Sequence, residues 1–116
     1  MKDFSKIRER YLRDTIQIRL GGIAANLARV CSFARNPGNK AAAESLIEEC
    51  KYFIEWTAPA AENDTRNYLV LRQIEFALWQ LKWDTIWSDE KKRSEIAALS
   101  KSYSEKILRL SGLLDG

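Results

Sequence analysis

The stretch YLVLRQIEFALWQLKWDTIW, residues 68–87, is the part of this sequence that decides the fold. It contains no Gly or Pro, so nothing in it interrupts a helix. Apolar residues recur at helical spacing on two sides, about 100° apart around the axis. A helix with so little polar surface must be covered from several directions, which predicts the central helix of a small bundle. The first predicted buried stripe contains Leu71, Ile74, Leu78, Leu81 and Thr85, and the second contains Leu69, Phe76, Trp79, Trp83 and Trp87.

Helical periodicity continues on both sides of this stretch. A break is expected near residues 14–18, where the apolar pattern changes register. Asn36-Pro37-Gly38-Asn39 is typical of a turn, and Pro59 ends another helix. The expected further helices cover residues 4–13, 18–35, 40–57 and 89–111. Asn39, Asn63 or Asp64, and Ser88 are the expected N-caps. The sequence therefore predicts one all-α domain over residues 1–116, an up-and-down four-helix bundle with an additional short N-terminal helix.

The charge of the chain is small in total and uneven along the sequence. The 116 residues carry a formal net charge of +3, with 30% charged and 46% hydrophobic residues. Residues 1–35 are net basic and residues 36–65 net acidic. A basic segment with aromatic residues suits single-stranded nucleic acid, whereas charges on helix faces usually only interact with solvent. The candidate nucleic-acid contacts are Arg8, Arg10, Arg13, Arg19 and Arg29.

Most residues that carry catalysis are missing from the sequence. There is no histidine, which removes the commonest general base, the usual catalytic triads and most zinc sites. No glycine-rich phosphate-binding loop is present. Cys31 and Cys50 fall on the apolar sides of their helices, where thiols behave as small hydrophobic groups. The sequence therefore predicts a protein that is not an enzyme and uses no cofactor or metal.

The cysteines and the first residues indicate a cellular location. Neither Cys31 nor Cys50 belongs to a C-x-x-C pair, and small secreted folds usually carry more cysteines. The start, MKDFSKIRERYL, lacks the apolar stretch of a signal peptide. No run approaches the length of a membrane span. We therefore expect a cytoplasmic protein with reduced thiols and no membrane contact.

Four tryptophans are the other unusual feature of this composition. Trp is enriched among the residues that anchor protein–protein interfaces, but it also fills cores. The sequence leaves both interpretations open for the tryptophan stripe, with Trp79 expected in the core. The candidate interface residues are Trp56, Trp83, Trp87 and Phe33.

Three segments carry a resemblance to known sequences. IRLGGIAANLARV (residues 18–30), FIEWTAP (residues 53–59) and IWSDE (residues 86–90) resemble a family of small uncharacterised helical proteins from cyanobacteria. The resemblance implies a cytoplasmic bacterial protein and supplies no activity or site. In size and helix order alone the chain is also similar to the basic four-helix proteins encoded in ribosomal RNA intervening sequences and diversity-generating retroelements.

Two functions are consistent with these observations. The first is a non-enzymatic protein–protein interaction module that self-associates, with a homodimer as the expected form, because the central helix carries more apolar surface than three short neighbours can cover. The alternative is a nucleic-acid-binding small subunit of a ribonucleoprotein or regulatory complex. A contiguous exposed apolar patch favours the first, and a basic stripe containing Arg8, Arg13, Arg19 and Arg29 favours the second.

Overall fold

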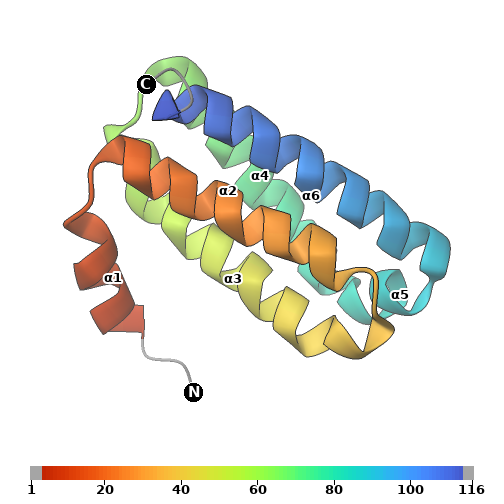
Figure 1. Cartoon of the computed structure of the whole chain (residues 1–116). Coiled ribbons are helices and arrows are strands. Elements are labelled where there is room, and N and C mark those ends of the chain that lie inside the picture. Colours follow the sequence, from red (N-terminus) through yellow and green to blue (C-terminus); the bar gives the residue numbers. More distant parts are fainter. Residues whose placement is uncertain (1–3, 114–116) are drawn as a thin grey trace.

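The computed structural model describes residues 4–113, and all regular secondary structure in that range is helical (Figure 1). The predicted all-α class is confirmed. No described helix is both long enough and apolar enough to cross a membrane. The elements are α1 (Phe4–Leu12), α2 (Ile16–Phe33), the 3-10 turn η1 (Pro37–Asn39), α3 (Lys40–Thr57), the 3-10 turn η2 (Ala58–Ala60), α4 (Asn63–Leu81), α5 (Trp83–Ser88) and α6 (Glu90–Ser111).

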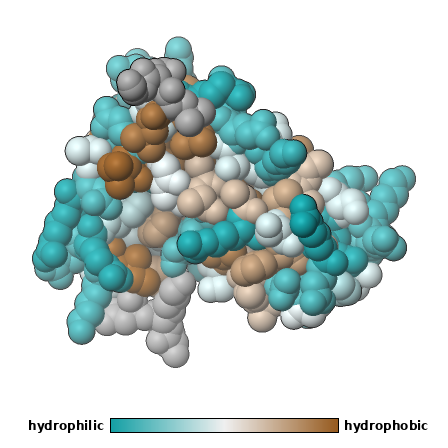
Figure 2. All heavy atoms as spheres, viewed as in Figure 1, coloured by the Kyte–Doolittle hydropathy of each residue, from teal (hydrophilic) through white to brown (hydrophobic). Residues whose placement is uncertain are grey.

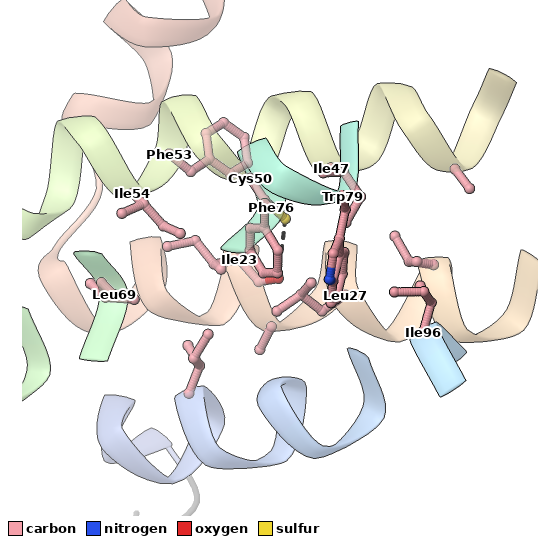
Figure 3. Packing of buried hydrophobic residues seen from close by; sticks show 14 of the residues in the cluster. Ile23, Leu27, Ile47, Cys50, Phe53, Ile54, Leu69, Phe76, Trp79 and Ile96 are labelled. Atoms are coloured by element: carbon pink, nitrogen blue, oxygen red, sulfur yellow. Dashed lines mark hydrogen bonds between the residues drawn. The ribbon is translucent and has the colours of Figure 1, made fainter. Parts of the chain in front are cut away.

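Four long helices enclose the core. In Figure 1, α2 runs between α6 and α3, and α4 lies behind them against α3. Between α4 and α6 the gap is filled by large rings, with Phe76 and Trp79 of α4 each 6.4 Å from Tyr103 of α6, centroid to centroid. Figure 3 shows Phe76 and Trp79 pointing toward buried aliphatic residues of α2 and α3. The large buried side chains include Ile23, Leu27, Ile47, Ile54, Leu69 and Phe76.

Helix α1 is an arm that docks on α3 through aromatic contacts. The predicted break follows it, and α2 begins after Thr15, whose side chain accepts a hydrogen bond from Ile18 N. The Tyr11 ring stacks on Phe53 with centroids 4.2 Å apart. The Tyr11 hydroxyl lies 2.9 Å from Arg19 O, to which it donates, and 2.8 Å from Thr57 Oγ1. The apolar side of α1 is therefore fixed to the start of α2 and the end of α3.

The central helix differs from the prediction at its C-terminal end. Instead of one helix through residue 87, α4 ends at Leu81, and Lys82 takes a non-helical conformation (φ −121°, ψ 19°) before α5. Because the chain turns here without Gly or Pro, the cause lies in tertiary contacts. The indole N–H of Trp83 donates to Lys40 O (3.0 Å), and that of Trp87 donates to Pro37 O (2.9 Å). The two rings stack with centroids 5.2 Å apart.

The predicted N-cap position of α3, Asn39, is confirmed, whereas the N-caps of α4 and α6 differ from the predicted residues. Asn39 makes no capping bond and instead donates from Nδ2 to Phe33 O (3.3 Å). The N-cap of α4 is Glu62, not Asn63 or Asp64. Asp89, not Ser88, caps α6 by accepting from Lys91 N and Lys92 N. The Asp89 carboxylate also interacts favourably with the dipole of α6.

Candidate protein interaction surface

One apolar stripe of the central helix is buried in the structure, and the other is exposed. The second stripe, for which the sequence leaves core and interface open except at Trp79, is buried: Leu69, Phe76, Trp79, Trp83 and Trp87 are each at most 8% exposed. The prediction that the first stripe is buried is wrong. Its aliphatic members are exposed, because α3 and α6 cover only the inward side of α4 and no described element covers the outward side. The exposed fractions are 57% for Leu71, 55% for Ile74, 58% for Leu78 and 81% for Leu81, and Thr85 is exposed as well.

These exposed residues form a surface that we call the outer face of α4, made of Val70, Leu71, Ile74, Leu78 and Leu81. It holds five of the eight exposed large hydrophobic residues of the described chain. Between residues 70 and 81, every exposed residue belongs to it, and every polar residue is at least half-buried. Figure 2 views the molecule from the side where α2 and α6 lie in front of α4, and shows mostly hydrophilic residues there, with hydrophobic patches on the left and a pale band across the centre. The other three exposed large hydrophobic residues are Ile18, Leu99 and Leu113.

The polar residues of α4 hold its edge against α3. Gln73 Nε2 donates to Lys51 O (3.0 Å). The Gln80 amide donates to Glu48 and accepts from the Lys51 ammonium. Since both glutamines are used in contacts with α3, neither contributes polar groups to the outer face.

The opposite edge of α4 is held against α6 by a charged and aromatic cluster. Arg72 Nε lies 3.2 Å from Glu75 Oε1, and its guanidinium carbon lies 4.8 Å from the Tyr68 ring centroid and 4.6 Å from that of Tyr103. The Tyr103 hydroxyl donates to Glu75 Oε2 (3.0 Å). Burial, and then this hydrogen bond, raises the pKa of Tyr103 to about 12. Both edges therefore fix the rotation of α4 so that the aliphatic stripe points outward.

The tryptophans proposed as interface anchors lie mostly inside the chain. Trp83 and Trp87 are buried with their N–H groups bonded, so in this fold they are core residues and offer no surface to a partner. Trp56 and Phe33 are partly buried. Trp56 belongs to the aromatic cluster under α1, 5.8 Å from the Tyr11 ring. A partner contact by Trp56 or Phe33 stays a prediction.

Two of the five candidate nucleic-acid contacts are engaged within the chain. The guanidinium of Arg19 donates to Leu12 O (2.9 Å) and Asp14 O (3.0 Å), where it closes the break between α1 and α2. Arg13 pairs with Glu9 at 3.0 Å. The remaining three, Arg8, Arg10 and Arg29, are exposed. A basic stripe that needs Arg19 would have to compete with its internal contacts, whereas Arg13 is itself exposed and its pair with Glu9 is a weak surface contact.

The potential metal ligands of the described residues are dispersed, and one of the two thiols is buried. Within residues 4–113, no three Cys, Asp or Glu side chains converge as a metal ion requires. Cys50 is fully buried, its Sγ lies 4.0 Å from Ile23 O (Figure 3), and burial raises the pKa of its thiol. Cys31, expected on the apolar side of its helix, is partly buried. The hollow between the start of α2 and the end of α6, about 290 Å³, has Glu62 as its single titratable lining residue.

The surface residues that sequence reasoning missed are those of the outer face. Four of these five residues belong to the first apolar stripe of the sequence, whose helical spacing predicts that it is buried. No protein-family model, no curated protein and no solved structure matches the chain. The outer face is therefore interpreted from its own physical chemistry.

Proposed function

We propose that this chain is a non-enzymatic protein–protein interaction module that self-associates through the outer face of α4. The observation that carries this proposal is the composition of that face. From residue 70 to residue 81 the exposed surface of α4 consists of five aliphatic side chains, whereas the polar side chains of the same segment are turned into the contacts with α3 and α6. We further infer that α2, α3, α4 and α6 form an up-and-down four-helix bundle in each copy, with α1 as an additional N-terminal helix.

The size of the outer face supports an interface. Its five branched side chains expose between 38% and 81% of their surface, which amounts to roughly several hundred Å² of apolar area. Contiguous patches of this size on soluble proteins mark interaction sites. Fully burying one aliphatic side chain contributes about 1.5–3 kcal/mol, so covering this stripe provides a large favourable term for association.

A second copy of the chain is the occupant that this area fits best. A standard interface buries about 800 Å² on each partner, so the aliphatic stripe can form its centre while the flanking polar residues of α4 and the neighbouring helices form its rim. In a two-fold dimer the same patch on each copy covers the patch on the other copy. The interface therefore needs only one exposed apolar stripe per chain.

Sedimentation velocity of matched variants tests the proposal. Ile74 is 55% exposed within the outer face, and Ile18 is 48% exposed on α2. Ile74→Glu buries a charge at the interface and is expected to convert the dimer to monomer, whereas Ile18→Glu is expected to sediment like the wild type. If Ile74→Glu leaves the mass distribution of the wild type unchanged, the outer face is not the interface.

The same samples test the nucleic-acid alternative, for which the exposed Arg8, Arg10 and Arg29 are the supporting observation. Fluorescent single-stranded RNA is added at physiological salt and again at higher salt. The interaction-module proposal predicts only weak, non-specific association. Tight binding that is lost in the triple Arg→Ala variant, kept in Ile74→Glu and weakened steeply by salt would favour the alternative instead.

A further inference from the structure

We infer that two copies pair through antiparallel α4 helices, related by a two-fold axis that passes over the middle of the outer face, near position 76. This inference rests on the proposed self-association and specifies its geometry. Face-to-face pairing of two α4 helices on a two-fold axis is either parallel, with equivalent residues facing one another, or antiparallel, with residues on opposite sides of the centre facing one another.

The outer face is symmetric about its centre. Leu71 and Leu81 are equally far from position 76, and so are Ile74 and Leu78. An antiparallel pair therefore places Leu71 opposite Leu81 of the second copy and Ile74 opposite Leu78 of the second copy. These four residues then each meet an aliphatic partner of similar volume, which is what close packing requires, and Val70 lies opposite Lys82 of the second copy.

The charges at the two ends of α4 favour the antiparallel orientation. Glu62, Asp64 and Arg66 are exposed at its amino-terminal end, with a net charge of −1, and Lys82 is exposed at its carboxyl-terminal end next to Asp84, which pairs with Lys40 (2.8 Å). Antiparallel pairing brings the acidic end of one helix toward the basic end of the other, whereas parallel pairing brings like ends together. The helix dipoles act in the same direction, because the positive amino-terminal end of each helix lies near the negative carboxyl-terminal end of the other. The aliphatic area supplies most of the affinity, and these charges select the orientation.

This orientation fixes where the N-terminal arms lie in the dimer. Helix α1 packs on the carboxyl-terminal half of α3, through Tyr52, Phe53 and Trp56, close to where α4 begins. In an antiparallel dimer the two arms therefore lie at opposite ends of the assembly. In a parallel dimer they would lie at the same end.

Disulfide trapping distinguishes the two orientations. Variants Leu71→Cys and Leu81→Cys are prepared separately with Cys31→Ser, while the buried Cys50 is retained. In an antiparallel dimer, two copies of position 71 lie about 15 Å apart along the axis, ten residues at 1.5 Å each, which is beyond the reach of a disulfide. Each variant alone is therefore expected to stay uncrosslinked under mild oxidation. An equimolar mixture is expected to form the covalent 71–81 dimer, with Ala98→Cys on α6 as a control that does not crosslink to either variant.

The possible outcomes separate this inference from the proposed function. Crosslinking of each variant with itself, and none between positions 71 and 81, would show a parallel dimer and overturn the orientation alone. A sedimenting dimer that forms no disulfide at these positions would also overturn it, because the copies would then meet elsewhere. A sedimenting monomer with no disulfide in any sample would overturn the proposed self-association itself.

Discussion

The inner and outer faces of α4 are made of similarly apolar residues, yet they differ in environment. The inner face carries Phe76 and Trp79, which are 0% and 8% exposed and pack between α2, α3 and α6. The outer face carries Ile74 and Leu78, which are more than half exposed. Both faces repeat at helical spacing. The comparison teaches that the periodicity of one helix identifies its apolar sides but does not tell how many of them the chain itself can cover.

Polar residues mark the boundary between the two faces. In an ordinary amphipathic helix the polar side chains point to water, opposite the core. In α4 the long polar side chains lie at the two edges, where Gln73 and Gln80 contact α3 and where Arg72 and Glu75 contact α6 through Tyr103. A helix whose polar groups are used at its edges leaves aliphatic residues as its outward surface.

The largest expected effect tests the inner face. Trp79→Ala should lower the free energy of unfolding by about 3–5 kcal/mol, the usual result of truncating a buried aromatic residue. Chemical denaturation at a protein concentration low enough to give monomers measures this loss directly. A loss below about 1 kcal/mol would mean that the inner and outer faces are equivalent in energy.

A smaller effect is expected beyond the end of α4, where the inner stripe continues as Trp83 and Trp87. Trp83→Phe keeps an aromatic ring but removes the hydrogen bond to Lys40 O, and Trp87→Phe removes the one to Pro37 O. Each should cost at least about 1 kcal/mol of unfolding free energy, the net contribution of a typical hydrogen bond, because the smaller ring also leaves a cavity at a buried position. Trp56→Phe is the matched control, since Trp56 makes ring contacts only. An equal loss in the control would mean that ring size, not the hydrogen bond, sets the cost.

Tyr103, which lies between α4 and α6, should make the free energy of unfolding depend on pH in the alkaline range. The pKa of Tyr103 is about 12 in the folded chain, against an ordinary value of 10.0. Below pH 10 this tyrosine is protonated in both states and its stabilising contribution is complete. Between pH 10 and 12 the unfolded chain releases the proton first, so stability falls as pH rises. Denaturation across this window should show a shallower decline for Tyr103→Phe, and an unchanged slope would mean that this hydroxyl is not protected by folding.

The smallest effect on stability is expected on the outer face. At high dilution, Leu78→Ser should change the free energy of unfolding by no more than about 0.5 kcal/mol, because the side chain is already exposed. Raising the protein concentration should stabilise the wild type by mass action but leave the variant unchanged. A large loss at high dilution would show that Leu78 belongs to the core of the monomer.

The sequence predicted most of the helical framework. Pro37 and Pro59 mark the ends of α2 and α3, and Trp79 is buried as predicted. The outward orientation of Leu71 and Ile74 could not be predicted, since it depends on where α3 and α6 lie in space.

The turn at Lys82 also lay beyond sequence reasoning. The indoles that follow the turn donate hydrogen bonds to carbonyls 43 and 50 residues earlier in the chain. Contacts between residues so far apart cannot be inferred from local helix propensity. The same holds for the contacts of Arg19, a candidate nucleic-acid contact, with Leu12 O and Asp14 O.

Sedimentation equilibrium of the wild-type chain tests the central claim most directly, because it asks whether the outer face of α4 is covered in solution. At micromolar concentration the account predicts a species of twice the 13.4 kDa chain mass. Because the interface is mainly aliphatic, this species should persist when salt is raised, since salt screens charges and does not weaken apolar contacts. A single 13.4 kDa species at every concentration and salt level would contradict the account.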